Sequence, residues 1–302
     1  MTFNLKRILI ISLCIAGFGL AAIVIYGQGS RHSNQTFNAE RAYNDLLFQI
    51  NQGPRTPGSL SHQKTGDWIK AELEKNGWAT SIQQTTQQGQ SIKNIIGKRG
   101  SQRPWIILGA HYDSRQIADR DPEIDNQRLP VPGANDGASG VAVLLELARI
   151  LPPALDQEIW IVFFDAEDQG NIPEWDWILG SRAFAQSLQA YPDDVVIVDM
   201  VGDEILNIYL EKNSNPDLSN EIWAVAVSLG YENYFIPEYK YRILDDHLPF
   251  IEKGISAVDI IDFDYPYWHT VSDTPDKTSP KSLKIVGDTL YFWLITPPDL
   301  AN

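Results

Sequence analysis

The segment Ile159–Gly170, IWIVFFDAEDQG, constrains the fold of this chain more than any other. It begins with six apolar residues, mostly β-branched or aromatic, which is the composition of a strand buried on both faces. Asp165, Glu167 and Asp168 follow directly. Acidic side chains at the end of a buried strand are costly to desolvate unless a cation lies among them. Taken alone, such a cluster is more simply a solvated turn with a helix cap, so the rest of the sequence must decide.

Four more segments lead to a potential metal ligand, three of them predicted strands and one a glycine-rich loop. They are Trp105–Ala110 before His111, Val195–Val198 before Asp199, Ile255–Ile261 before His269, and the loop Gly133–Gly140 around Asp136. In open α/β sheets, ligands bind beyond the carboxyl ends of the strands. Two histidines and three carboxylates gathered at one such edge would make a site for zinc or a similar ion.

The segments that carry these residues occur in the order GAHYDS, GANDGASGVAVLLELAR, FFDAED, VDMVGD and YWHT. This combination resembles the zinc-dependent M28 peptidase family, which contains aminopeptidases and glutaminyl-peptide cyclotransferases. The resemblance extends from Phe37 to the C-terminus. It implies one α/β domain, with a mostly parallel or mixed central sheet flanked by helices.

The resemblance also assigns roles to individual residues. The metal ligands that it implies are Asp136, Asp168 and His269, joined by His111 and Asp199 where a second ion is bound. It makes Glu167 the general base. That assignment is chemically sensible, because a base must contact the substrate without being held by the ion that its neighbour binds. Many aminopeptidases of the family have Glu at the position of Asp168, and the Glu-Asp pair looks more like bacterial glutaminyl cyclases.

Other residues resemble the cyclase branch. Asp246 lies in an Asp-Asp-His segment that the cyclases share, where it is expected to assist proton movement; the simpler alternative for this segment is a capped helix start. Trp268 precedes His269, and Trp175 or Trp177 is expected to form a second wall of the substrate pocket. Asp199 leaves the activity open. It is a metal ligand in two-metal peptidases and a hydrogen-bonding partner in one-metal cyclases, or simply a buried acid bonded to backbone amides.

Residues 1–34 are predicted to be a membrane anchor or signal segment with a tether, and residues 35–302 the catalytic domain. Lys6 and Arg7 precede the uncharged run Ile8–Tyr26, which is long enough to span a bilayer. The positive residues should stay inside, so the catalytic domain is expected outside the cytoplasm, anchored, or secreted if the segment is cleaved. The single cysteine, Cys14, lies in this run, so the exported part has no disulfide.

The chain has a net charge of −15 at pH 7, which argues against a nucleic-acid partner. The expected partners are peptide or protein N-termini as substrate, and the membrane through the N-terminal segment. The sequence predicts a glutaminyl-peptide cyclotransferase that holds one Zn²⁺ and converts N-terminal Gln to pyroglutamate with release of ammonia. The alternative is an aminopeptidase with two zinc ions. A binding protein on an inactive scaffold is disfavoured, because all five ligand positions are filled.

Overall fold

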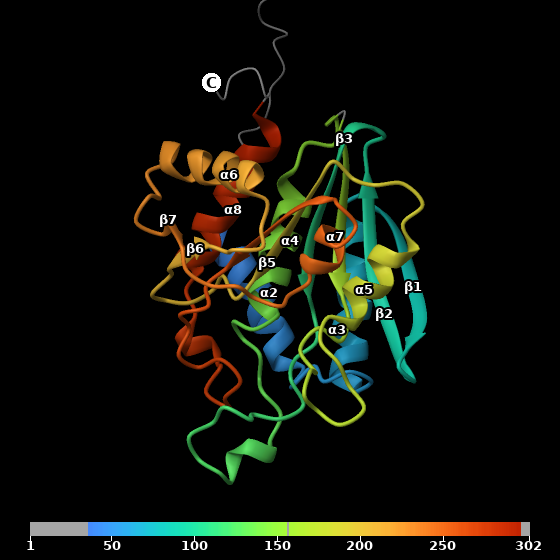
Figure 1. The fold of residues 1–302 in the computed structure, drawn as a ribbon, viewed down its shortest axis with the longest axis vertical. Coiled ribbons are helices and arrows are strands. Elements are labelled where there is room, and N and C mark those ends of the chain that lie inside the picture. The colour runs from blue at the N-terminus through green and yellow to red at the C-terminus, as the bar shows by residue number, and fades with distance from the viewer. Residues whose placement is uncertain (1–35, 156, 297–302) are drawn as a thin grey trace, which may run out of the picture. The chain divides into compact units, whose positions relative to one another are not determined.

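A six-stranded sheet lies at the centre of the computed structural model, which describes residues 36–155 and 157–296 (Figure 1). The strands lie in the order β1-β2-β4-β3-β5-β8. Their bounds are β1 (Ala79–Gln87), β2 (Gln90–Arg99), β3 (Gln102–His111), β4 (Gln157–Phe164), β5 (Asp194–Asp199) and β8 (Ser256–Ile261). Strands β4, β3, β5 and β8 are parallel, and the hairpin β1-β2 adds antiparallel to β4. The predicted mixed, largely parallel sheet is confirmed.

The four parallel strands are the apolar runs of the sequence. In β4 the segment Ile161–Phe164 is fully buried, and β5 is buried from Val195 onward. Such strands are covered on both faces, which is why they show continuous rather than alternating apolar residues. Because the strands run parallel, their carboxyl ends meet at one edge of the sheet, and the polar residues that follow them are brought together there.

Helices cover both faces of the sheet (Figure 1). One face packs against a group of five, which are α2 (Ala39–Asn51), α3 (Leu60–Lys75), α4 (Ala138–Ile150), α6 (Pro216–Ser228) and α8 (Pro280–Ile295). The other face packs against the shorter α5 (Leu179–Ser187) and α7 (Leu248–Ile251). A small parallel sheet of β6 (Ile208–Leu210) and β7 (Phe235–Tyr239), and the 3-10 turns η1 (Asn126–Arg128) and η2 (Pro275–Lys277), complete the described elements.

The predicted membrane anchor and tether, residues 1–34, lie outside the described residues. Among the helices of residues 36–155 and 157–296, none has the length and apolar character needed to cross a bilayer.

Candidate metal centre and active site

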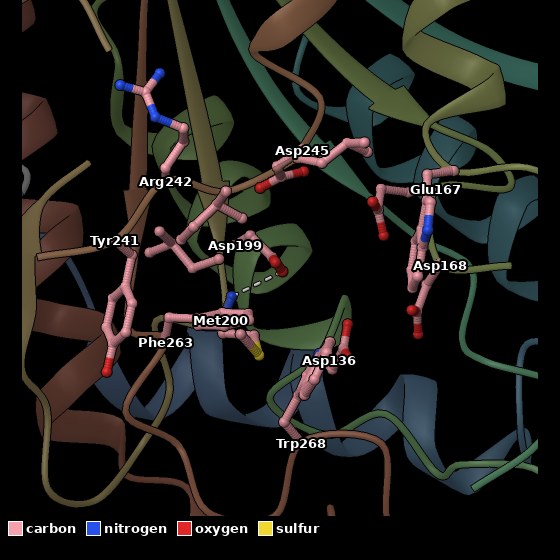
Figure 2. A pocket seen from close by; sticks show the side chains of 14 residues that line it. Asp136, Glu167, Asp168, Asp199, Met200, Tyr241, Arg242, Asp245, Phe263 and Trp268 are labelled. Carbon is pink, nitrogen blue, oxygen red and sulfur yellow. Dashed lines mark hydrogen bonds between the residues drawn. The ribbon is translucent and has the colours of Figure 1, made fainter. Parts of the chain in front are cut away.

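The residues predicted to bind metal, and Glu167 with them, gather at the carboxyl edge of the sheet. Figure 2 shows four of these acids, Asp136, Glu167, Asp168 and Asp199, around one cavity. His111 ends β3, Asp199 ends β5, and the acidic segment that includes Glu167 and Asp168 follows β4. Asp136 lies just before α4, and His269 lies in the loop after β8. Each of these side chains is at least nine-tenths buried as a residue, so their charges are largely removed from water.

Asp136, Asp168 and His269 form one group of possible ligands. Each offers an atom within 4.8 Å of the others. His269 Nε2 lies 2.8 Å from Asp168 Oδ1 and 3.8 Å from Asp136 Oδ2. Within the described residues, Asp136 Oδ2 and Asp168 Oδ2 are buried without a hydrogen-bond partner. Buried carboxylate oxygens without donors fit a bound cation, and one imidazole with two carboxylates is a ligand set that Zn²⁺ accepts.

His111, Asp136 and Asp199 form a second group that shares Asp136 with the first. His111 Nε2 lies 3.1 Å from both Asp136 Oδ1 and Asp199 Oδ1. Burial lowers the pKa of His111. The charge of Asp199 and hydrogen bonds to Asp113, Asp136 and Asp199 outweigh burial and raise this pKa well above its usual value. The imidazole therefore lies between the two carboxylates of its group. Of the residues that belong to one group only, Asp168 alone has a buried carboxylate oxygen without a hydrogen-bond partner in the described residues.

Asp113 supports both ligand groups from beneath. Its carboxylate lies 3.4 Å from His111 Nδ1 and accepts the backbone N–H groups of Glu167 at 3.1 Å and Asp168 at 3.3 Å. The Gln169 side chain donates to it at 2.9 Å. Burial alone would raise the pKa of Asp113, but His111 and these donors lower it. Asp113 is thus placed to orient the imidazole of His111, and the same carboxylate fixes the acidic loop.

The Asp136 loop is held by a residue that the sequence did not single out. Asp273 accepts the backbone N–H groups of Asn135 at 2.8 Å and Asp136 at 3.1 Å. Gly137 has a left-handed φ of 91°, and a Cβ atom there would lie 2.7 Å from the Asp113 carbonyl oxygen. A glycine is therefore needed at this point of the GANDGASG segment. The only sequence signal for Asp273 was its place four residues after His269.

A second missed pair orients His269 and Asp168. His269 Nδ1 lies 3.3 Å from Asp119 Oδ1, and Arg115 Nε donates to the same oxygen at 2.7 Å. Arg115 Nη1 donates to the main-chain oxygen of Asp168 at 3.0 Å. Burial raises the pKa of Asp119, but His269 and Arg115 lower it by more. The long polar segment Arg115–Pro132 thus begins with residues that contact two of the ligands.

A cavity of about 260 Å³ adjoins the ligand groups. Its walls combine acidic side chains with aromatic ones, among them Tyr241, Phe263 and Trp268 (Figure 2). Trp177 lines the same cavity. The rings of Trp268 and Trp177 stack on His269 with centroid distances of 3.7 Å and 6.0 Å. Trp175 instead packs against a separate cluster around Ile92. Of the two tryptophans that the sequence left open, the structure places Trp177 on the cavity wall.

The two adjacent aspartates before His247 differ in position. Asp245 lines the cavity, whereas Asp246 is fully buried and is not part of the wall. Burial, and next to it the charge of Asp245, raise the pKa of Glu167 well above its usual value. Asp245 and Glu167 thus line the same cavity, whereas Asp246 lies behind its wall, and the role of Asp246 in proton movement stays a prediction.

Comparison with known proteins agrees with this arrangement of ligands. The sequence pattern of peptidase family M28 matches residues 94–294. The chain belongs to peptidase family M28. The family prediction is confirmed, and with it the expectation that the chain is an enzyme.

Three relatives show how the likeness is distributed within the family. A glutaminyl cyclase structure from Porphyromonas gingivalis is 34% identical with a TM-score of 0.80, covering 85% of this chain and 98% of that one. A Zn-dependent exopeptidase structure from Parabacteroides distasonis is 31% identical with a TM-score of 0.80, covering 87% and 99%. The glutaminyl-peptide cyclotransferase of Boiga irregularis is 25% identical, covering 80% and 77%. Relatives named glutaminyl cyclase support the predicted cyclase function, and the similar exopeptidase shows that the aminopeptidase alternative is also present in the family.

Proposed function

We propose that this enzyme is a zinc-dependent glutaminyl-peptide cyclotransferase, which converts an N-terminal Gln to pyroglutamate and releases ammonia. The observation that carries the proposal is the aromatic cavity beside His269. Trp268 and Trp177 both stack on this ligand and both line the cavity. In cyclisation the substrate's own amine attacks the side-chain carbonyl, so water must be kept away from the reacting carbon. Broad indole walls serve that purpose.

The ligand pattern supports one zinc rather than two. Asp168, which belongs to the first group alone, has a buried oxygen without a hydrogen-bond partner in the described residues, of the kind that an ion satisfies, whereas neither His111 nor Asp199 has such an atom. Zinc bound by the first three residues would polarise the γ-carbonyl of the substrate Gln. Asp199 then remains free for the hydrogen-bonding role that the one-metal enzymes give it.

The chain's own groups carry the proton. Glu167 lines the cavity but belongs to neither ligand group, so its carboxylate is free to contact the substrate. It takes a proton from the α-amine as the ring closes and passes that proton to the departing ammonia. The raised pKa of Glu167 suits both steps, because a stronger base accepts the proton more readily at neutral pH. Asp245 and Asp199 orient this carboxyl from the other walls, a role that we assign to Asp245 in preference to Asp246.

The second candidate is a zinc aminopeptidase, and a specific observation favours it. His111, Asp136 and Asp199 stand within 4.8 Å of one another and share Asp136 with the first group, as a two-ion site requires. In that enzyme Glu167 would activate water, and the free amine of the peptide would approach the acidic cluster.

One assay separates the two reactions. Purified enzyme is given a Gln-initiated and a Leu-initiated peptide of otherwise identical sequence, and ammonia and free amino acids are measured in both. We expect ammonia and a pyroglutamyl peptide from the first and little free leucine from the second. Rapid release of leucine, with no ammonia from the Gln peptide, would establish the aminopeptidase.

We also propose that residues 1–34 anchor the catalytic domain on the outer side of the membrane or, if cleaved, release it. The support is the uncharged run that follows Lys6 and Arg7. Protease added to intact spheroplasts should digest the catalytic domain. A domain that stays protected until the cells are lysed would show that this topology is wrong.

A further inference from the structure

A buried polar cluster lies behind Asp245, away from the ligand groups. It consists of Glu211 just after β6, His247 at the start of α7, and Asp259 within β8, each at most 2% exposed. His247 Nε2 lies 3.2 Å from Glu211 Oε2, and His247 Nδ1 lies 3.6 Å from Asp259 Oδ2. The imidazole is thus placed between two carboxylates from different elements.

Glu211 is the fixed end of this cluster. Its Oε2 accepts the backbone N–H groups of Asn213 at 2.7 Å and Ser214 at 2.8 Å, and the Ser214 hydroxyl at 3.0 Å. Its Oε1 accepts the backbone N–H of Ile243 at 2.9 Å. Burial raises the pKa of Glu211, but His247 and these donors lower it below the usual value. A carboxylate held by so many donors has one orientation, so the imidazole that lies 3.2 Å from it has a fixed neighbour.

The other side of the imidazole meets the acids that reach the cavity. Asp245, His247 and Asp259 each offer an atom within 4.8 Å of the others. Both oxygens of Asp259 and one oxygen of Asp245 have no hydrogen-bond partner in the described residues. Buried carboxyl groups in this state need a polar neighbour that compensates them. The imidazole of His247 lies 3.6 Å from Asp259 and within 4.8 Å of Asp245, so it is the ring placed to do so.

We propose that His247 is a positioning residue. Held by Glu211, it fixes the place of the Asp245 carboxyl group opposite Glu167. The proposal rests on the proposed function, because its effect is measured through the step in which Glu167 moves a proton. His247 touches neither the cavity nor the ligands of the first group, so its loss should lower kcat while KM and bound zinc stay nearly unchanged.

The test is a double-mutant cycle on the purified enzyme. His247→Gln, Asp245→Asn and the double variant are compared by kcat, KM and zinc content. Loss of a residue that orients a neighbouring functional group typically costs about 10- to 100-fold in activity. We expect such a fall in kcat for His247→Gln alone and no further fall when it is added to Asp245→Asn. Glu211→Gln, which keeps the shape of the side chain, should lower kcat in the same direction.

A matched control separates positioning from general loosening of the fold. Asp45 in α2 pairs with Arg149 in α4 and is also buried, but it lies outside the site. In the double variant Asp45→Asn with Asp245→Asn, the fold-reduction in kcat should equal the product of the two single reductions. If the reductions in kcat of His247→Gln and Asp245→Asn also multiply in their double variant, the proposal is overturned. Loss of zinc from His247→Gln would overturn it as well, since the cluster would then hold metal.

Failure of the proposed function gives a different result. If wild-type enzyme releases amino acids and no ammonia, the cyclase assignment fails, but Glu167 still faces Asp245 across the same cavity. The cycle is then measured on the hydrolysis, where the same non-additivity supports the role of His247 and full additivity refutes it.

Discussion

Glu167 and Asp168 are adjacent acids with different proposed tasks, and a pair of matched amide substitutions tests that difference. Glu167→Gln keeps the length and shape of the side chain but cannot accept a proton as a carboxylate does. Because Glu167 belongs to neither ligand group, the variant should bind zinc as the wild type does. Asp168→Asn changes a residue whose Oδ1 lies 2.8 Å from His269 and whose Oδ2 is unpaired, so it should lose zinc.

The expected rate loss follows from the chemistry of the proton transfer. A positioned general base typically contributes about 10²- to 10⁴-fold to the rate. At least about 100-fold of kcat should therefore disappear in Glu167→Gln, which corresponds to about 2.7 kcal/mol of transition-state stabilisation. Burial and the charge of Asp245 raise the pKa of Glu167, so this base is stronger than an exposed glutamate and its loss should be felt fully.

The assay is steady-state ammonia release from a Gln-initiated peptide, with zinc content measured on the same preparations by atomic spectroscopy. Asp168→Asn serves as the control for metal loss, and its activity should fall together with its zinc. Near-normal turnover in zinc-loaded Glu167→Gln would remove Glu167 from the mechanism. Loss of zinc from that variant would show instead that Glu167 is a ligand, and the division of tasks between the two acids would be wrong.

Three further predictions follow from the geometry, and they use four substitutions. His269→Ala should abolish stoichiometric zinc binding, because it removes one of three ligands, and a purified variant with wild-type zinc would contradict the ligand set. Trp177→Ala should lower kcat/KM, whereas Trp175→Ala, which lies outside the cavity, should leave kinetics unchanged and lower only the melting temperature; equal kinetic effects would place both in the site. Gly137→Ala should destabilise the fold by roughly 1 kcal/mol or more in denaturant unfolding, because alanine disfavours its φ of 91°, and unchanged stability would show that the loop adapts.

The sequence by itself determined the sheet and the set of groups at its edge. Continuous apolar runs such as Ile159–Phe164 are long enough for buried strands, and a strand of this kind must be covered on both faces. Parallel strands then bring their carboxyl ends to one edge, so His111, Asp199 and the acids after Phe164 had to meet. This inference needs only local composition and the geometry of parallel sheets.

Only the tertiary structure decided which side chains in the loops face the cavity. Asp245 turns inward and Asp246 does not, and Trp177 lines the wall while Trp175 packs away from it. Local patterns do not predict this, because irregular segments have no periodicity that assigns a face. Ala166 and His269 even adopt left-handed φ values of 52° and 57°, which residues other than glycine rarely choose on their own. Contacts with residues distant in the sequence impose such conformations, so the neighbouring sequence does not predict them.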